Sequence, residues 1–261
     1  MALKALKRLY KYRELLYMLA LRDFKIRYKQ TALGFLWALF TPLAVVLAGV
    51  VIRFIAADRA HLGQFDLASI IVKSLPWTFF VGAVRSSLSS LVGNGNLVAK
   101  MYFPKEVFPM AAIVARLTDF GVATAISIVV LVVFMDVRFT ALAWLAIPMF
   151  LVVVMLALGF ALLLSCLNLL YRDVQYVVDV ILTFAIFFTP VLYDVSMLGE
   201  YSTLALLNPM APLLEGFRDV LVLGKLPDPF WITYSCTFAL AVLLFGYWVF
   251  KSLETVFAER V

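Results

Sequence analysis

Three long runs without a charged residue constrain this chain more than any other feature of its sequence. They cover Ala32–Ile52, Phe139–Tyr171 and Pro229–Phe250, which are 21, 33 and 22 residues long. About 20 apolar residues in a helix span the hydrocarbon core of a bilayer. The chain as a whole is 65% hydrophobic with a mean hydropathy of +1.03, whereas a soluble domain is about half apolar. The sequence therefore predicts an all-α integral membrane protein.

Hydrophobic segments of spanning length predict six transmembrane helices. Their expected ranges are Leu33–Ile55, Ala68–Val92, Val107–Phe134, Leu142–Leu169, Tyr176–Leu192 and Phe230–Phe250. The second is the least regular because Lys73 and Arg85 interrupt it, although Arg85 can extend toward a nearby interface. With no internal repeat or linker, we expect a single domain: a cytoplasmic interface segment, residues 1–31, and a six-span bundle, residues 32–261.

The distribution of Lys and Arg predicts that both termini are cytoplasmic. Nine basic residues precede the first span, and fourteen lie on that side of the predicted membrane, against five on the other. Cytoplasmic segments carry the excess of basic residues in membrane proteins. The net charge of +6 is thus a consequence of topology and does not indicate nucleic-acid binding.

A short basic segment before the first span is predicted to be an amphipathic helix in the membrane plane. In Leu21–Lys29, the side chains of Leu21, Phe24 and Tyr28 share one helical face, with basic residues beside them. Such a helix either anchors the first span through its positive charge or binds an anionic lipid headgroup.

The segment between the second and third spans, Asn94–Pro109, is too short and too polar to cross the membrane. It carries Met101, Tyr102 and Phe103 on the predicted cytoplasmic side. An exposed aromatic cluster in a short loop is typical of a docking surface for a partner. The alternative is that these side chains fold back into the membrane interface.

On the opposite side, residues 193–229 remain moderately apolar and are interrupted by prolines. Two short helical pieces, Leu204–Leu207 and Leu213–Leu223, are expected to form a re-entrant or interfacial hairpin that must be covered by protein. Glu215, Arg218 and Asp219 stand at helical spacing and can pair. We expect this pairing to be on the surface.

Charged and aromatic positions within the spans indicate which faces are directed inward. In the fifth span, Tyr176, Asp179, Thr183, Phe187 and Pro190 fall on one helical face. An acid within a span faces protein or water, so this face either contacts a passing amphiphilic chain such as a glycan or packs against a neighbouring helix.

Two further patterns have structural interpretations. In the third span, Arg116 and Asp119 are expected to form an ion pair inside the bundle. Small residues along the first span favour close packing, either within the monomer or against a second copy.

Motifs that would make the chain an ATPase are missing. No G-x-x-x-x-G-K-[ST] phosphate loop occurs in the sequence. If transport is driven by ATP, another subunit must bind the nucleotide and Mg²⁺, so we expect no cofactor in this chain.

Four segments resemble the ABC-type polysaccharide export permeases, the Wzm-like O-antigen and teichoic-acid exporters. They are RDFKIRYKQTALGFLWALFTPL (Arg22–Leu43), LVAKMYFPKEVFP (Leu97–Pro109), LNLLYRDVQYV (Leu167–Val177) and LNPMAPLLEGFRDVLVLG (Leu207–Gly224). The likeness covers essentially the whole chain, with the motifs in the expected order. The first segment is more similar to the O-antigen and teichoic-acid group than to the capsule group.

The resemblance implies a permease dimer in a bacterial inner (plasma) membrane, bound to two copies of a separate ATPase. The substrate would be a polysaccharide, most directly O-antigen, on an undecaprenyl-diphosphate carrier. Lys11–Lys29 would be an interface helix, and Leu204–Leu223 the outer gate helices. The first and fifth spans would line a channel between the protomers.

The resemblance also assigns roles to individual residues. Candidates for the carrier headgroup are the basic residues Arg22, Lys25, Arg27 and Lys29. The coupling loop seated in the ATPase would be Lys100, Met101, Tyr102, Phe103, Pro104, Lys105 and Glu106. Channel-lining candidates are Phe40, Tyr176, Thr183, Phe187 and Phe188, and outer-gate candidates are Glu215, Arg218 and Asp219.

Alternative functions remain open from the sequence. An export permease for capsule, teichoic acid or a small lipid or drug would have the same topology. A membrane-embedded transferase acting on a prenyl-linked sugar would need clustered acidic metal ligands at the cytoplasmic interface. The acids predicted on that side form no D-D-x-x-D-type cluster, which disfavours the transferase.

Overall fold

The computed structural model describes residues 11–29, 67–100 and 103–254, together with Phe40, Leu43, Ala44, Leu47, Val51 and Phe257. The side chains of Ala99 and Lys100 lie outside this description. So does most of the predicted first span, Leu33–Ile55. Within the described ranges the chain is helical apart from turns and short connections.

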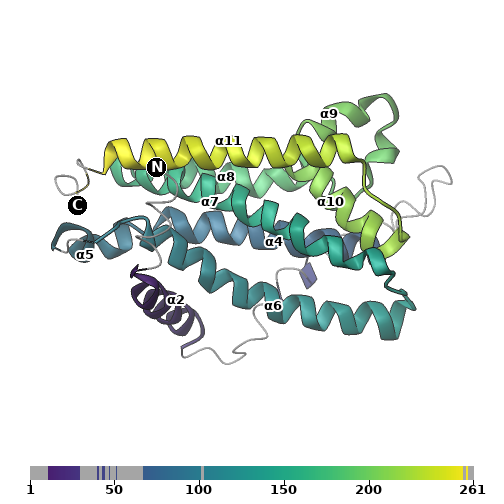
Figure 1. Ribbon diagram of the computed structural model, residues 1–261, viewed down its shortest axis with the longest axis horizontal. Coiled ribbons are helices and arrows are strands. Elements are labelled where there is room, and N and C mark those ends of the chain that lie inside the picture. Colours follow the sequence, from purple (N-terminus) through teal and green to yellow (C-terminus); the bar gives the residue numbers. More distant parts are fainter. Residues whose placement is uncertain are drawn as a thin grey trace.

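Four described helices are long and apolar enough to cross a membrane. They are α4 (Leu67–Leu88), α6 (Val107–Met135), α7 (Ala146–Leu170, extended at its start by the 3₁₀ turn η2, Ala141–Leu145) and α11 (Pro229–Leu253). These helices run side by side along the long axis of the molecule (Figure 1). They correspond to the predicted second, third, fourth and sixth spans.

The predicted fifth span is only partly matched by α8 (Asp173–Phe188). This helix has 16 residues, so its length is about 24 Å against a hydrocarbon thickness of about 30 Å. It ends before Pro190, where extended backbone at Thr189 stops the helical hydrogen bonding. The predicted extension to Leu192 is therefore wrong, because Leu192 follows the proline in a turn.

Short helices stand at the two ends of the bundle (Figure 1). At one end lie α2 (Arg13–Tyr28), the turn η1 (Val92–Asn94) and α5 (Gly95–Lys100). At the other end lie η3 (Val195–Tyr201), α9 (Ser202–Leu206), α10 (Met210–Arg218) and the π-helical turn η4 (Asp219–Leu223). The expected pair of short helices between the fifth and sixth spans is therefore present. Its depth in a bilayer stays a prediction.

Helices α7 and α11 approach each other through two glycines. A Cβ added to Gly159 would lie 2.7 Å from the backbone nitrogen of Leu243, and one added to Gly246 would collide with the carbonyl oxygen of Gly159. Small residues allow such backbone contact between helices in lipid, where van der Waals packing replaces the hydrophobic driving force. The two helices consequently form a tightly packed pair.

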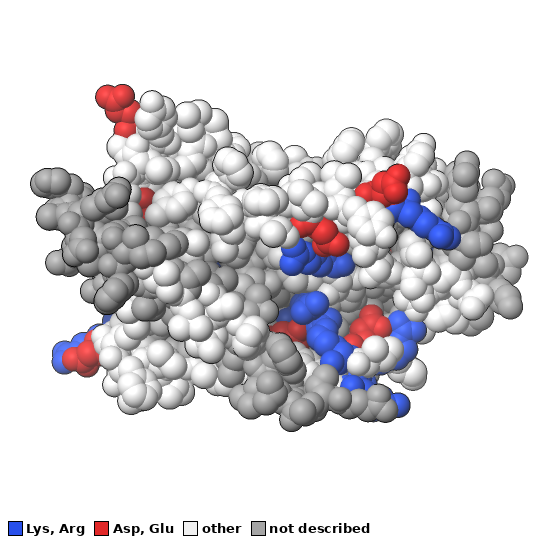
Figure 2. Space-filling model, turned by 180° about the vertical axis from the view of Figure 1, so that it is seen from behind, with Lys and Arg blue, Asp and Glu red and all other residues white. Residues whose placement is uncertain are grey.

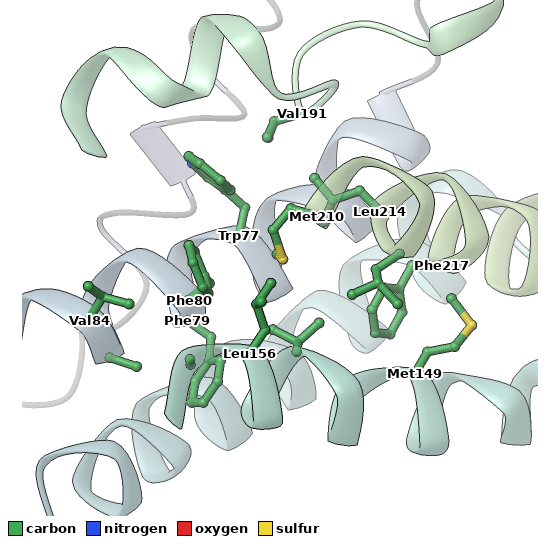
Figure 3. Close-up of a cluster of buried hydrophobic side chains, with 14 of the residues drawn as sticks. Trp77, Phe79, Phe80, Val84, Met149, Leu156, Val191, Met210, Leu214 and Phe217 are labelled. Carbon is green, nitrogen blue, oxygen red and sulfur yellow. The ribbon is translucent and has the colours of Figure 1, made fainter. Parts of the chain in front are cut away.

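The larger apolar core joins α10 to α4 and α7. Figure 3 shows Trp77 and Phe80 of α4 and Leu156 of α7 close to Met210 and Leu214 of α10. All seven apolar or glycine residues of α10 are buried, and its charged residues Glu215 and Arg218 are half-buried. This helix is thus an internal part of the bundle and not a surface appendage.

A second apolar core closes the opposite end. Leu19 and Ala20 of α2 pack there with Phe108 of α6, Cys166 of α7 and Phe250 of α11. The predicted face of α2, with Leu21, Phe24 and Tyr28, is only half-buried. Leu19 and Ala20 are the buried residues of α2, whereas Tyr28 of the predicted face contacts α6 through Asp119.

The glycine contact generates a stability prediction. Replacing Gly246 with Leu must push α11 away from α7, because no side-chain atom fits against the carbonyl of Gly159. Overpacking of this kind costs about 1–3 kcal/mol or more, so the unfolding midpoint of the purified protein in detergent should fall. Gly121→Ala in α6 is the control, because no described atom lies within 4 Å of the added Cβ. Equal midpoints for the two variants would contradict the prediction.

Candidate functional site

The basic residues predicted to bind a headgroup all lie on the last two turns of α2 or directly after it. They differ in their partners: Arg22 pairs with Asp23 at 2.7 Å, and Arg27 pairs with Asp119 of α6. Lys25 and Lys29 are exposed, and neither forms an ion pair within the described ranges. An open hollow of about 770 Å³ runs along this part of α2, lined by residues that include Arg22, Lys25 and Lys29.

Asp119 is the centre of a polar cluster between α2 and α6. Its two carboxylate oxygens accept hydrogen bonds from Arg27 and from the Tyr28 hydroxyl, the latter at 2.7 Å. Arg116 approaches the same carboxylate at 3.4 Å, which confirms the predicted pairing of Arg116 with Asp119. Burial and the hydrogen bond to Asp119 raise the pKa of Tyr28 to about 12, so its hydroxyl stays a donor at any physiological pH.

The coupling-loop candidates are partly described, since Met101 and Tyr102 fall outside the described residues and Lys100 is described by its backbone alone. Phe103 is half-buried and its ring lies 5.4 Å from that of Phe108. Pro104 is buried, and Lys105 stands 5.7 Å from the ring centre of Phe257. The one described aromatic of the predicted docking cluster is therefore folded toward the bundle.

Glu106 has a role that its place in the loop did not predict. Its side chain is 2% exposed and pairs with Lys251 near the end of α11 at 2.9 Å. Lys251 also contacts Glu254 at 2.8 Å. A carboxylate removed from water requires such a partner, so this ion pair attaches the loop to the end of α11.

The channel-lining candidates lie on exposed surface of the chain. Tyr176, Phe187 and Phe188 of α8 are exposed, Phe188 at 75% of its surface. Phe40 is exposed as well. Val178 is the one buried residue of α8. An arrangement of this kind leaves an aromatic face for a ligand, a second chain or lipid.

Thr183 and Asp179 belong to a polar contact between α8 and α4. Arg85 of α4 pairs with the Asp179 carboxylate at 3.2 Å and donates to the Thr183 hydroxyl at 2.7 Å. Arg85 is therefore directed toward α8. The sequence indicated that Asp179 faces protein or water, and the structure identifies Arg85 as its partner.

The outer-gate candidates Glu215 and Arg218 belong to a buried charge network with two further residues. Lys73 of α4 is fully buried, and its Nζ lies 2.6 Å from Asp194 and 3.1 Å from Glu215. Arg218 contacts the same two acids, at 3.2 and 3.3 Å. The expectation of a surface ion pair is wrong, because α10 is buried against α4 and brings Glu215 to Lys73.

Every charge in this network is offset by an opposite one. Lys73 also donates to the carbonyl of Tyr193 at 2.7 Å, and Arg218 donates to the Ser69 hydroxyl at 3.2 Å. Asp219 is half-buried and joins none of the ion pairs formed by the described residues. The network therefore joins three segments: α4, the connection after α8, and α10.

Sequence reasoning missed Lys73, Asp194 and Lys251 as members of these sites. The sequence did indicate that Lys73 needs an ion-pair partner, because a charged residue inside a span is normally paired and functional. The partner itself was not identifiable, because Asp194 lies 121 residues away and Glu215 lies 142 residues away.

Comparison with known proteins agrees with this architecture. The family described as ABC-2 type transporter matches residues 14–222. The O-antigen export system permease protein RfbA of Myxococcus xanthus is 29% identical over 266 residues, covering 99% of this chain and 100% of the relative. A protein of the same name from Klebsiella pneumoniae is 29% identical, covering 94% of each chain. The polysialic acid transport protein KpsM of Escherichia coli is 22% identical, covering 90% and 92%. These relatives confirm the resemblance to polysaccharide export permeases.

The buried network generates a second stability prediction. Lys73→Met leaves Asp194 and Glu215 with one cation between them, and breaking a buried ion pair costs about 3–5 kcal/mol. The unfolding midpoint in detergent should fall clearly. Adding Asp194→Asn should recover part of the loss, since Glu215 then keeps Arg218 as a partner.

Arg138→Met is the matched control for this experiment, because Arg138 is exposed and forms no ion pair within the described ranges. Its midpoint should stay close to that of the parent protein. A Lys73→Met variant as stable as the control would show that the network contributes nothing to stability.

Proposed function

Because the chain belongs to the ABC-2 type transporter family, we propose that it is the transmembrane subunit of an ATP-driven exporter of undecaprenyl-diphosphate-linked polysaccharide, with O-antigen as the substrate. The observation that carries this proposal is the end-to-end similarity to O-antigen export permeases from two organisms. The protein would lie in a bacterial inner membrane as a homodimer, with both termini and α2 on the cytoplasmic side.

A separate ATPase would supply the energy. The chain itself has no phosphate-loop motif, and its relatives are named as permeases. Two copies of the ATPase would bind the two permease chains at the loop Lys100–Glu106. Tyr102 and Met101 are the candidates for direct contact, since Phe103 packs against Phe108.

Contacts at the two ends of α11 support a mechanical route from this loop to the opposite end. At the loop, Lys251 holds Glu106. At the other end, the Tyr234 hydroxyl donates to the carbonyl of Leu207, between α9 and α10, at 2.7 Å. Since α11 is packed against α7 through Gly159 and Gly246, a displacement of the loop would move the helix pair and the gate helices together.

The exposed aromatic face of α8 supports a glycan path on that side. Tyr176, Phe187 and Phe188 offer ring surfaces on which sugar C–H groups stack, and the Thr183 hydroxyl on the same helix is held by Arg85. Pairing of α8 faces from two protomers would enclose a passage. Capsule and teichoic-acid polymers share this chemistry, and the relative named for polysialic acid transport makes a capsule-type substrate the second candidate.

The decisive experiment reconstitutes the chain with the ATP-binding subunit of its export system. Co-expression should yield a stable complex of two permease and two ATPase chains. In inverted vesicles whose outward-facing leaflet, the former cytoplasmic one, contains lipid-linked O-antigen, ATP should move the polymer into the lumen. A non-hydrolysable ATP analogue should not. Transport of a small fluorescent lipid with no transport of polymer would instead favour a lipid or drug exporter.

Glu106 and Lys251 generate a prediction about coupling. Glu106→Gln removes the charge that holds Lys251, so ATP hydrolysis by the complex should continue while polymer moved per ATP falls severalfold. The charge exchange Glu106→Lys with Lys251→Glu should restore part of the transport. Glu254→Gln is the control, because Glu254 also contacts Lys251 but does not belong to the loop. Equal loss in both single variants would argue against the proposed route.

A further inference from the structure

We propose that a groove between α4, α6 and α8, near the end of α2, binds the diphosphate group of the lipid-linked substrate, with Arg116 and Arg85 as its ligands. This inference rests on the proposed function and makes it more specific. It assigns the headgroup to arginines of the spans, and not to the residues of α2 that the sequence suggested.

Arg116 forms one wall of the groove. Its side chain extends from α6 across α4, where Nε donates to the Ser86 hydroxyl at 2.7 Å. It passes over Gly82, at which an added Cβ would lie 3.5 Å from Nε. Ser86 thus holds the guanidinium beside Gly82, while 30% of the Arg116 side chain remains exposed.

Arg85 forms the opposite wall. It is one residue from Ser86, but its guanidinium is directed to Asp179 and Thr183 of α8. The side chain is 40% exposed. Figure 2 shows charged side chains on both sides of a hollow on this face of the molecule. The two arginines therefore approach the groove from different helices, each oriented by a hydroxyl and a carboxylate.

The charges around the groove leave an excess of positive charge. Arg27, Arg85 and Arg116 are the cations, and Asp119 and Asp179 are the acids. Asp119 binds Arg27 and Tyr28 closely, whereas Arg116 contacts it at only 3.4 Å. Arg116 is thus the least compensated of the three guanidinium groups. An incompletely paired charge in a membrane span is costly, and an anionic ligand would remove that cost.

Two guanidinium groups suit a diphosphate better than a single carboxylate. A guanidinium binds two phosphate oxygens with its parallel N–H donors, and two guanidiniums on opposite walls can each take one phosphate. A diphosphate that links a lipid to a sugar carries two negative charges. The excess positive charge of the groove attracts such an anion.

The position of Arg85 along α4 also suits a lipid headgroup at the membrane surface. Arg85 stands three residues before α4 ends at Leu88, which places it about 4.5 Å from the end of that helix. The α2 end of the bundle is the proposed cytoplasmic side. If a diphosphate is bound here, its lipid chain would extend into the membrane, and its glycan would lie near Thr183 and the aromatic face of α8.

Direct binding tests the site independently of transport. The complex with its ATPase is placed in phosphatidylcholine nanodiscs, and binding of radiolabelled undecaprenyl diphosphate is measured. Arg116→Gln and Arg85→Gln should each weaken binding at least about tenfold, because each removes charged hydrogen bonds. Arg138→Gln, at an exposed arginine near the opposite end of α6, should bind like the parent protein.

Two further measurements keep the outcome decisive. Arg116→Lys retains the charge beside Asp119, so it should fold normally yet bind more weakly than the parent, because it lacks the two parallel donors. Undecaprenyl monophosphate and phosphatidylglycerol serve as competitors. Either one displacing the diphosphate at equal concentration would show a general phospholipid site and overturn the assignment.

The two proposals fail in different ways. Unchanged binding in Arg116→Gln and Arg85→Gln, with polymer export intact in the parent complex, would exclude the groove and leave the proposed function standing. A parent complex that hydrolyses ATP but exports no polymer would exclude the proposed function, whatever the binding measurements show.

Discussion

A cation that cannot reach water governs the arrangement of the half of this protein that contains α10. Lys73 lies in the second turn of the apolar helix α4 and is fully buried, so its charge has to be met within the fold. Asp194 and Glu215 meet it, and Arg218 neutralises the remaining acid charge. Because these residues come from three segments, α10 is held inside the bundle, and the core around Trp77 and Met210 can close over it.

The same rule explains the other polar contacts. Glu106 is buried and has Lys251, Arg27 has Asp119, and Arg85 has Asp179. Each pair joins helices that are distant in the sequence, and each lies where apolar packing alone would not fix the relation between them. Arg116 stands apart, because it shares Asp119 with two closer partners. That difference is the basis for assigning it a ligand.

How much of this structure the sequence predicted depends on how far apart in the sequence the interacting residues lie. Charge-free length identified α7 and α11, and a hydrophobic segment of spanning length identified α6. Helical spacing identified the contacts Arg116–Asp119 and Glu215–Arg218. The partners of Arg27, Lys73 and Glu106 are more than 90 residues away, and no periodicity carries that information. The same limit led to a surface assignment for Glu215. The end of α8 was misplaced because apolar residues continue beyond Pro190.

In the proposed exporter, the contact between Gly159 and Gly246 would restrict where a polymer can travel. The backbones of α7 and α11 touch at that point. A contact that leaves no room for a methyl group cannot admit a hydrated pyranose ring. No sugar-wide conduit can therefore run between α7 and α11 while they remain together. In the proposed exporter, the passage would therefore widen beside α8, most of whose side chains are exposed, while α7 and α11 would move as one packed unit.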